Sequence, residues 1–385
     1  MKNVLVVFHD CHKHTGASAS MLDLIAGLKQ KPLIKLSAIV PNEDGLLIHE
    51  LDRIGIPWAS FSYGSSRFSV AHGLKRSIST FLRAWGRFFM SIFSLLRARR
   101  TLKEIDVVYS NTTDITFGLL LGYFFNKKHV CHVREFGYLD QSARQMVGDR
   151  LFYKLMYKYS DLVVTISDAL RLFILEQVDD YQNKVIRLYD DLTLTNGNDT
   201  VKNFEKNNKF LMVGTLVPQK GQEFIIRVVS KLRDAGVELN LGLAGQGNEK
   251  NTKHLKRLIS ELNLGSQVEL LGQIEHVWAI REQYMGVFVA SRSEAFGRVT
   301  IEALRAGQIV LASNSGANSE LIDHSENGFL YELDDLNSCV LMVQKIMTME
   351  ERELAKISSR ARASSQFYYQ FQSANTIAEN ILTRL

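Results

Sequence analysis

The feature that most constrains the fold is an alternation of short apolar runs with helical patterns along the chain. Runs rich in Val, Ile and Leu, such as residues 3–8, 106–110 and 210–213, are typical of buried strands. Segments between them, such as 17–29, carry apolar residues at helical spacing. Repeated strand–helix units predict parallel sheets with helices on both faces. The sequence therefore predicts an α/β protein built from doubly wound sheets.

The alternation stops at residues 190–208, which are polar and rich in Asn, Asp and Thr, and then starts again. A length of 385 residues exceeds one ordinary domain and suits two. We expect Rossmann-like domains at 1–189 and 209–364, joined by a linker at 190–208. An amphipathic helix at 365–385 either caps its own domain or crosses back to the first, which is the arrangement that we expect. Doubly wound sheets bind ligands at the carboxyl ends of their strands, so we expect the site in a cleft between the domains.

Composition excludes several classes of protein. Hydrophobic residues make up 46% and charged residues 23% of the chain, which excludes disordered and collagen-like chains. The three cysteines are far apart and odd in number, which argues against a disulfide framework and for a reducing compartment. No signal peptide is recognisable, and the longest apolar runs are shorter than the roughly 20 residues that span a bilayer. We therefore expect a cytoplasmic protein.

The net charge of +5 is concentrated in one segment, residues 66–103, which contains nine basic residues and no Asp or Glu. The nine are Arg67, Lys75, Arg76, Arg83, Arg87, Arg97, Arg99, Arg100 and Lys103. Aromatic and aliphatic residues are interleaved with them, so a helix here would be apolar along one side and rich in Arg elsewhere. This pattern favours docking to an anionic membrane surface over binding of nucleic acid. The alternative is that the apolar stripe packs on the first sheet and the arginines are merely solvated.

The segment SRSEAFGRVTIEALRAG at 291–307 carries the chemistry most clearly. It follows an expected strand, and its helix begins near Arg298, where free backbone amides can bind an anion. Gly297 would let a ligand approach the backbone closely. Glu294 and Glu302 form a carboxylate pair suited to accepting hydrogen bonds from sugar or ribose hydroxyls. From the spacing alone, Glu302 could equally be a solvated helix residue.

This segment resembles the E-x7-E signature of the family-4 retaining glycosyltransferases of the GT-B fold, with Glu294 and Glu302 as its two glutamates. The similarity covers most of the chain and is stronger in the second domain, through GTLVPQKGQEF, LGLAGQGN and AGQIVLASNSGANSELIDHSENGFLYELDD. It implies two Rossmann-like domains facing a central cleft. It also implies transfer of a hexose-type sugar, with retention, from a nucleotide-diphosphate sugar (UDP favoured) to an acceptor hydroxyl. A lipid-linked or cell-surface glycan intermediate of polysaccharide biosynthesis is the expected acceptor, handled at the inner face of the membrane.

The resemblance assigns roles to residues of the second domain. Glu294 would contact hydroxyls of the donor sugar, Glu302 would bind the ribose, and Lys220 would neutralise the diphosphate as its bond to the sugar breaks. Many relatives carry Arg where this chain has Thr215, and we hypothesise that Arg298 supplies the missing charge. The donor-binding candidates are Gly16, Thr215, Lys220, Gly245, Phe296, Gly297, Arg298, Val299 and Glu302. Neither a metal nor any other cofactor is implied.

The first domain adds two candidates. The motif CHVREF ends a strand where family members carry a histidine close to the donor sugar; His132 is the expected catalytic residue, and Arg134 competes for the place. Gly16 opens a helix in a loop that resembles the one near the donor phosphates. The cluster at 9–14 contains His, Asp and Cys but lacks the spacing of a zinc site, and is interpreted as a polar loop.

Two alternative functions remain open. A nucleotide-sugar epimerase can share the same architecture, and product analysis without acceptor would separate it from a transferase. A non-catalytic partner subunit could keep the fold, although the presence of Lys220, Glu294 and Glu302 argues against it. The chain lacks both G-x-G-x-x-G after its first strand and a Walker loop, which weakens a dinucleotide oxidoreductase or a P-loop NTPase.

Overall fold

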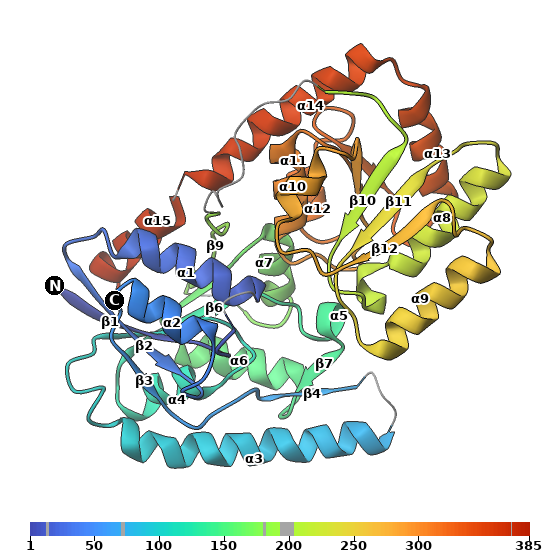
Figure 1. The fold of residues 1–385 in the computed structure, drawn as a ribbon. Coiled ribbons are helices and arrows are strands. Elements are labelled where there is room, and N and C mark those ends of the chain that lie inside the picture. Colours follow the sequence, from blue (N-terminus) through green and yellow to red (C-terminus); the bar gives the residue numbers. More distant parts are fainter. Residues whose placement is uncertain (13–14, 71–73, 180–181, 193–203, 371) are drawn as a thin grey trace. The chain divides into compact units, whose positions relative to one another are not determined.

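The computed structural model describes residues 1–12, 15–70, 74–179, 182–192, 204–370 and 372–385 (Figure 1). The chain divides into two compact units, each of which is described by itself. The first unit comprises Met1–Thr193 together with Gln370–Leu385, and the second comprises Leu194–Tyr369.

The first unit is built on a seven-stranded parallel sheet in the order β3-β2-β1-β5-β6-β8-β9. Its strands are β1 (Lys2–Val7), β2 (Ile34–Val40), β3 (Trp58–Ser60), β5 (Val107–Ser110), β6 (Lys128–Val133), β8 (Leu162–Thr165) and β9 (Val185–Arg187). Along β1, Val4 and Val6 join one apolar core, while Leu5 and Val7 join a second core on the opposite face. Both faces of the sheet are therefore covered, as expected of a doubly wound domain.

Helices cover the two faces of this sheet, and a small antiparallel pair, β4 (Arg67–Ser69) with β7 (Ala143–Gln145), lies beside it (Figure 1). The helices are α1 (Gly16–Leu28), α2 (Leu46–Arg53), α3 (Leu74–Ala98), α4 (Phe117–Phe124), α5 (Tyr138–Gln141), α6 (Asp149–Tyr159), α7 (Asp168–Leu175) and α15 (Gln372–Thr383). No helix among the described residues is long and apolar enough to cross a membrane.

The last helix, α15, packs in the core of the first unit. Ile377 and Ile381 are fully buried in the same apolar cluster as α1 and the sheet. Asp191 caps the start of α15, because its carboxylate accepts hydrogen bonds from the amides of Ser373 and Ala374, each at 3.2 Å. Asp190 to Leu192, which the sequence assigns to the linker, are buried in this unit, whereas residues 193–203 of that linker lie outside the described residues.

The second unit has a six-stranded parallel sheet in the order β12-β11-β10-β13-β14-β15. Its strands are β10 (Lys209–Val213), β11 (Asn240–Ala244), β12 (Val268–Gly272), β13 (Gly286–Val289), β14 (Ile309–Ser313) and β15 (Phe329–Tyr331). Its helices are η1 (Pro218–Lys220), α8 (Gln222–Asp234), α9 (Glu249–Glu261), α10 (Val277–Arg281), α11 (Arg298–Ala306), α12 (Asn318–Leu321), α13 (Leu336–Thr348), α14 (Glu351–Ser365) and η2 (Gln366–Tyr369).

Each sheet has one point at which the strand order reverses. The first sheet grows from β1 towards β3 on one side and from β5 towards β9 on the other. The second grows from β10 towards β12 and from β13 towards β15. The prediction of two doubly wound parallel-sheet domains is therefore confirmed. The pairs β1–β5 and β10–β13 mark the switch points, where such sheets bind their ligands.

Candidate functional site

In the second unit, the predicted residues gather at the carboxyl ends of four neighbouring strands. Thr215 follows β10, Gly245 follows β11, Glu294 follows β13, and Gly316 follows β14. The middle two of these strands, β10 and β13, form the switch point of the sheet. Motifs that are separate in the sequence therefore lie together at the carboxyl ends of the strands of one sheet.

Lys220 and Glu294, two of the predicted catalytic residues, are in contact. Lys220 Nζ lies 3.0 Å from Glu294 Oε2 and 3.3 Å from Ser291 Oγ. The turn that carries Lys220 is fixed by Gly221, whose φ is +79° and where a Cβ would lie 2.3 Å from the Ala290 carbonyl oxygen. The side chains of Lys220 and Glu294 are 36% and 16% exposed, so the pair is accessible to a ligand.

The backbone of Glu294 is held from the loop after β14. The Ala317 amide donates to the Glu294 carbonyl at 2.8 Å. Gly316 adopts a φ of +56°, and a Cβ there would lie 2.3 Å from the same carbonyl oxygen. Only glycine combines this conformation with this close approach, so Gly316 positions the turn that presents Glu294.

The helix α11 begins beside this pair. Gly297 occupies its N-cap position with a φ of +87°, and Arg298 and Val299, both half-buried, form the first turn. Phe296 is buried, and its ring meets Tyr368 edge-on, with the ring centroids 6.2 Å apart. The first-turn amides of a helix have no partners within the helix, so this start is suited to holding an anion.

Glu302 lies one turn further along α11 and contacts Arg281, a residue that the sequence analysis did not single out. Arg281 Nη2 donates to Glu302 Oε2 at 3.0 Å, and Nη1 donates to Gln308 Oε1 at 2.9 Å. Arg281 is fully buried, with its guanidinium 5.5 Å from the centre of the Trp278 ring. Burial lowers the pKa of Arg281, and the charge of Glu302 opposes that shift. The buried Arg281 thus fixes the position of the Glu302 carboxylate.

Two further donor-binding candidates belong to adjacent turns. Gly245 has a φ of +151°, and a Cβ there would lie 1.9 Å from the Gly214 carbonyl oxygen, so the position requires glycine. Thr215 is exposed, and its carbonyl accepts a hydrogen bond from Gln222 Nε2 at 2.9 Å. Both residues lie on the loops that follow β10 and β11.

In the first unit, His132 is the last residue but one of β6 and is buried. Its Nδ1 lies 2.9 Å from the Tyr109 hydroxyl and 3.1 Å from Arg134 Nη2. Because a guanidinium only donates, Nδ1 is an acceptor, and the proton of the neutral ring is on Nε2. Burial and the nearby charge of Arg134 lower the pKa of His132 well below its ordinary value, so the imidazole is neutral. Nε2 is buried without a hydrogen-bond partner among the described residues and lies 3.8 Å from Asp190 Oδ1.

Arg134, the competing candidate, is part of the same buried network. Its Nε donates to the carbonyl and side-chain oxygens of Asn111, both at 3.1 Å, and its Nη1 pairs with Asp190 Oδ2. His132 and Arg134 are therefore placed together, at the carboxyl end of the sheet. Asp190 was assigned to the linker in the sequence analysis, and no local pattern indicated this role.

The loop after β1 supplies a polar group at the switch point of the first sheet. His9 Nε2 lies 3.2 Å from Asp10 Oδ2, and Ser18 Oγ donates to Asp10 Oδ1 at 2.9 Å. Burial alone would lower the pKa of His9, but the hydrogen bond and charge of Asp10 outweigh it and raise the pKa above its ordinary value. A Cβ at Gly16 would meet nothing within 4 Å, so packing does not demand glycine and space remains there.

The predicted polar loop at 9–14 is described in part, since residues 13 and 14 lie outside the described residues. Within the part of the chain that the structure describes, no group of three His, Cys, Asp or Glu residues could hold a metal ion.

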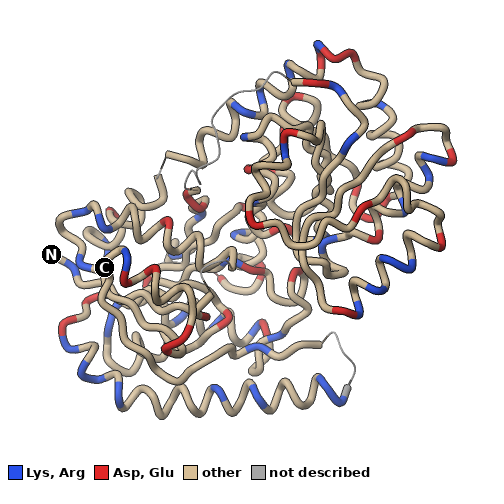
Figure 2. Tube along the Cα trace, in the orientation of Figure 1, with Lys and Arg blue, Asp and Glu red and all other residues tan. Residues whose placement is uncertain are grey.

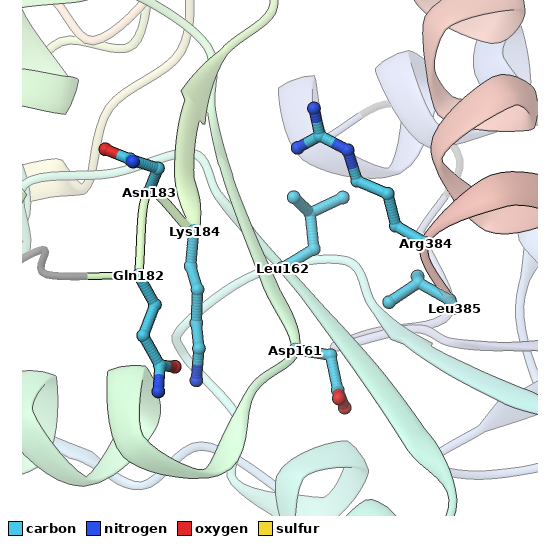
Figure 3. Close-up of a pocket in the computed structure, with 7 residues that line it drawn as sticks. All are labelled: Asp161, Leu162, Gln182, Asn183, Lys184, Arg384 and Leu385. Carbon is cyan, nitrogen blue, oxygen red and sulfur yellow. The ribbon is translucent and has the colours of Figure 1, made fainter.

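Two pockets lie in the first unit, away from these networks. The pocket in Figure 3, of about 140 Å³, borders the amino ends of β8 and β9. It therefore lies at the opposite end of the strands from the carboxyl ends, where doubly wound sheets bind their ligands. Two of its charged groups are already paired, because Lys184 Nζ donates to the Ser160 carbonyl at 3.0 Å and Asp161 accepts a hydrogen bond from Lys128 Nζ at 2.8 Å. A larger pocket of about 470 Å³ is formed by α5, α6, α7 and β7 and is lined by Phe136, Tyr138, Leu139, Arg144, Gly148, Asp149, Arg150, Leu151, Phe173 and Gln177.

Residues 198–364 match the family described as glycosyl transferases group 1. An uncharacterized glycosyltransferase of Methanocaldococcus jannaschii is 27% identical over 251 residues, which cover 64% of this chain and 67% of that protein. The N-acetylgalactosamine-N,N'-diacetylbacillosaminyl-diphospho-undecaprenol 4-alpha-N-acetylgalactosaminyltransferase of Campylobacter jejuni is 27% identical over 271 residues, or 68% and 71% of the two chains.

Solved structures show the same fold over the whole chain. Anabaena HepE in complex with UDP and glucose superposes with a TM-score of 0.75 at 18% identity and covers all of both chains. TarM superposes with a TM-score of 0.76 at 13% identity, covering 100% of this chain and 99% of that one. The two-domain architecture is thus the GT-B fold.

Proposed function

We propose that this chain, whose residues 198–364 match the family described as glycosyl transferases group 1, is a retaining glycosyltransferase that uses a UDP-sugar. It would move a hexose-type sugar to an acceptor hydroxyl. The observation that carries the proposal is the accessible Lys220–Glu294 pair beside the start of α11, at the switch point of the second sheet. A cation, a carboxylate and a helix start in one place suit a diphosphate joined to a sugar.

In the proposed reaction, binding of the donor separates Lys220 from Glu294. The Lys220 ammonium leaves Glu294 for the diphosphate, and the Glu294 carboxylate accepts hydrogen bonds from the sugar hydroxyls. The amides of the first turn of α11 and the side chain of Arg298 share the charge of the diphosphate. Glu302, held by Arg281 at 3.0 Å, binds the ribose hydroxyls. These groups stabilise the leaving diphosphate without a metal ion, which is electrostatic catalysis.

The bond changes balance without a protein nucleophile. The bond from the anomeric carbon to the diphosphate oxygen breaks, and its electron pair stays on that oxygen. The acceptor oxygen bonds the anomeric carbon on the same face, which retains the configuration. The acceptor proton passes to a donor phosphate oxygen. The neutral His132 would donate its Nε2 hydrogen to a donor sugar hydroxyl, and the open space at Gly16 would admit the donor phosphates.

Two comparisons support the finer parts of the proposal. HepE was solved with UDP and glucose, which favours uracil over guanine as the base. The Campylobacter relative acts on a diphospho-undecaprenol acceptor, which favours a lipid-linked acceptor or a related cell-surface glycan intermediate. We accordingly propose that the protein works in the cytoplasm, peripherally on the inner face of the membrane.

The test is a panel of UDP- and GDP-sugars incubated with purified protein, with nucleotide release measured by chromatography and sugar products by NMR. We expect slow hydrolysis of one UDP-sugar without acceptor. Lys220→Ala should reduce turnover by about 100- to 1,000-fold, as loss of one leaving-group stabiliser does. Lys253→Ala, which removes an exposed lysine paired with Glu249 at 2.7 Å, is the control and should change nothing.

Other outcomes of the panel would contradict the proposal. An epimerised donor sugar among the products would indicate an epimerase. In a separate calorimetric titration with UDP, the absence of nucleotide binding would indicate a non-catalytic partner subunit. Arg298→Ala should raise the KM for the donor, and unchanged turnover and nucleotide affinity would show that Arg298 does not supply the second cation.

A further inference from the structure

The helix α3, with 25 residues the longest helix of the described chain, turns its apolar face away from its own domain. The side that packs on the domain carries mostly small or polar residues, namely Ala84, Ser91, Ser94 and Ala98, together with Leu95, all of them buried. Amphipathic helices of globular proteins ordinarily bury their apolar stripe instead. Most of this stripe therefore does not pack on the first sheet, although Leu95 does join the core beside it.

Hydrogen bonds to the backbone hold the inner side of α3 in place. Ser94 Oγ donates to the Ser62 carbonyl at 2.8 Å, and Thr80 Oγ1 lies 3.3 Å from the Ser69 carbonyl. Arg87 Nη2 donates to the Arg67 carbonyl at 3.3 Å. The helix thus docks on its domain without using its outer apolar side chains.

The outer face presents a row of large apolar side chains. Its members are Ile78, Leu82, Phe89, Met90, Ile92, Phe93 and Leu96, each at least 39% exposed. Most of them recur at intervals of three or four residues, which places them along one side of the helix. Trp85 joins them through ring contacts with Phe88 and Phe89. A contiguous exposed apolar surface of this kind marks an interaction site.

Positive charge flanks this apolar row. Exposed basic residues lie along α3 and just after it, and they are Lys75, Arg76, Arg83, Arg97, Arg99 and Arg100. No Asp or Glu occurs between Ser66 and Lys103, and Figure 2 shows only Lys and Arg coloured along α3. Arg67 is a correction to the predicted basic face, because it is buried and its Nη2 lies 3.3 Å from Glu135.

The chemistry of this face identifies its partner. We propose that α3 is a membrane-docking helix, whose outer apolar side chains enter an anionic bilayer while the flanking arginines and lysine bind lipid head groups. A second copy of this chain fits poorly, since a symmetric contact through α3 would bring like charges together. One part of the inference rests on the proposed function: a protein docked on the membrane through α3 could take up a lipid-linked acceptor from the bilayer.

The test is co-sedimentation of the full chain with vesicles of phosphatidylcholine alone or with 30% phosphatidylglycerol. The wild type should bind the anionic vesicles at least tenfold more tightly, and salt should weaken the binding. Phe89→Ser/Phe93→Ser/Leu96→Ser should abolish it. Arg76→Gln/Arg83→Gln/Arg97→Gln should weaken it about a hundredfold, because each cation near the surface contributes about a factor of five.

Matched controls separate this face from exposed residues elsewhere. Leu172→Ser/Leu341→Ser removes two exposed leucines, and Lys253→Gln/Arg257→Gln removes two exposed cations of α9; both should bind vesicles like the wild type. Equal binding by the wild type and the α3 variants, or no lipid-dependent binding, would overturn the proposal. So would a wild-type dimer in solution that the Phe89/Phe93/Leu96 variant dissolves.

Donor hydrolysis, measured without vesicles, should be unchanged in both α3 variants. Vesicle binding without donor hydrolysis would contradict the proposed function and support the docking role of α3. Hydrolysis without vesicle binding would do the reverse.

Discussion

At the scale of single residues, Arg281 illustrates a positioning role that no local pattern reveals. It ends the short helix α10, is distant in sequence from Glu302, and lies fully buried beneath it. Arg281→Met should raise the KM for the donor about tenfold and change kcat less than threefold, because it loosens a ribose contact made equally in ground and transition states. Steady-state kinetics on the active UDP-sugar measure both quantities.

The control for this prediction is Arg257→Met, which removes an exposed arginine 3.5 Å from Glu261 on α9. An unchanged KM in Arg281→Met, with the variant still folded by circular dichroism, would show that Arg281 does not position Glu302. A kcat that falls in parallel with kcat/KM would assign the contact to the transition state instead.

Asp140 makes the stability of the first unit depend on pH. Burial raises the pKa of its carboxyl to about 6, and one carboxylate oxygen is buried without a hydrogen-bond partner among the described residues. The folded state therefore holds this proton more tightly than the unfolded chain. Its contribution to stability is largest below about pH 4 and is lost as the pH rises towards 6.

Asp140→Asn should remove the loss of stability that the wild type suffers as this carboxyl ionises above about pH 4. The variant should match the wild type near pH 4 and exceed it above pH 6 by roughly 1–3 kcal/mol in the free energy of unfolding, measured with urea. Asp234→Asn, at an exposed carboxylate paired with Arg233, controls for the change of charge. A difference that is constant from pH 4 to 7 would contradict the account of Asp140.

At the scale of elements, the loop after β14 sets the position of the turn after β13. Gly316→Ala should push the Glu294 carbonyl away, since a Cβ would lie 2.3 Å from it, and turnover should fall about 100-fold. Gly236→Ala is the matched control, because Gly236 also has a positive φ, +75°, but a Cβ there would meet nothing within 4 Å. Gly236→Ala should lose roughly 1–2 kcal/mol of stability through its positive φ. Gly316→Ala should lose more because of the added clash, and only Gly316→Ala should lose activity.

Elements also show where prediction from sequence succeeds and where it fails. Buried strands and the helix that carries Glu302 were predictable, because β-branched runs and helical spacing are local signals. The amphipathic pattern of 66–103 predicted a helix with one apolar side, but could not decide whether that side faces the domain. The pairing of Arg281 with Glu302 and of Arg134 with Asp190 depends on long-range packing, which a single sequence does not encode locally.

At the scale of the whole molecule, the chain divides its tasks between two units. The second unit gathers Lys220, Glu294 and Glu302 at one edge of its sheet, whereas the first gathers His132 and Arg134 at the end of its own. The first unit also carries the outward-facing helix α3 and is completed by α15 from the end of the chain. Under the proposed function, the second unit would hold the nucleotide and diphosphate of the donor, whereas the first would supply the acceptor and add His132 and Gly16 to the donor site.

The most direct test of the central claim is hydrogen–deuterium exchange of the full chain with and without UDP. We predict that UDP slows amide exchange at residues 214–221 and 291–302, the loops and helix start that surround the Lys220–Glu294 pair, and leaves α9 unchanged. Protection at these two segments should be lost in Lys220→Ala and kept in Lys253→Ala. Protection confined to other segments, or none at UDP concentrations that saturate related transferases, would contradict the assignment of the donor site.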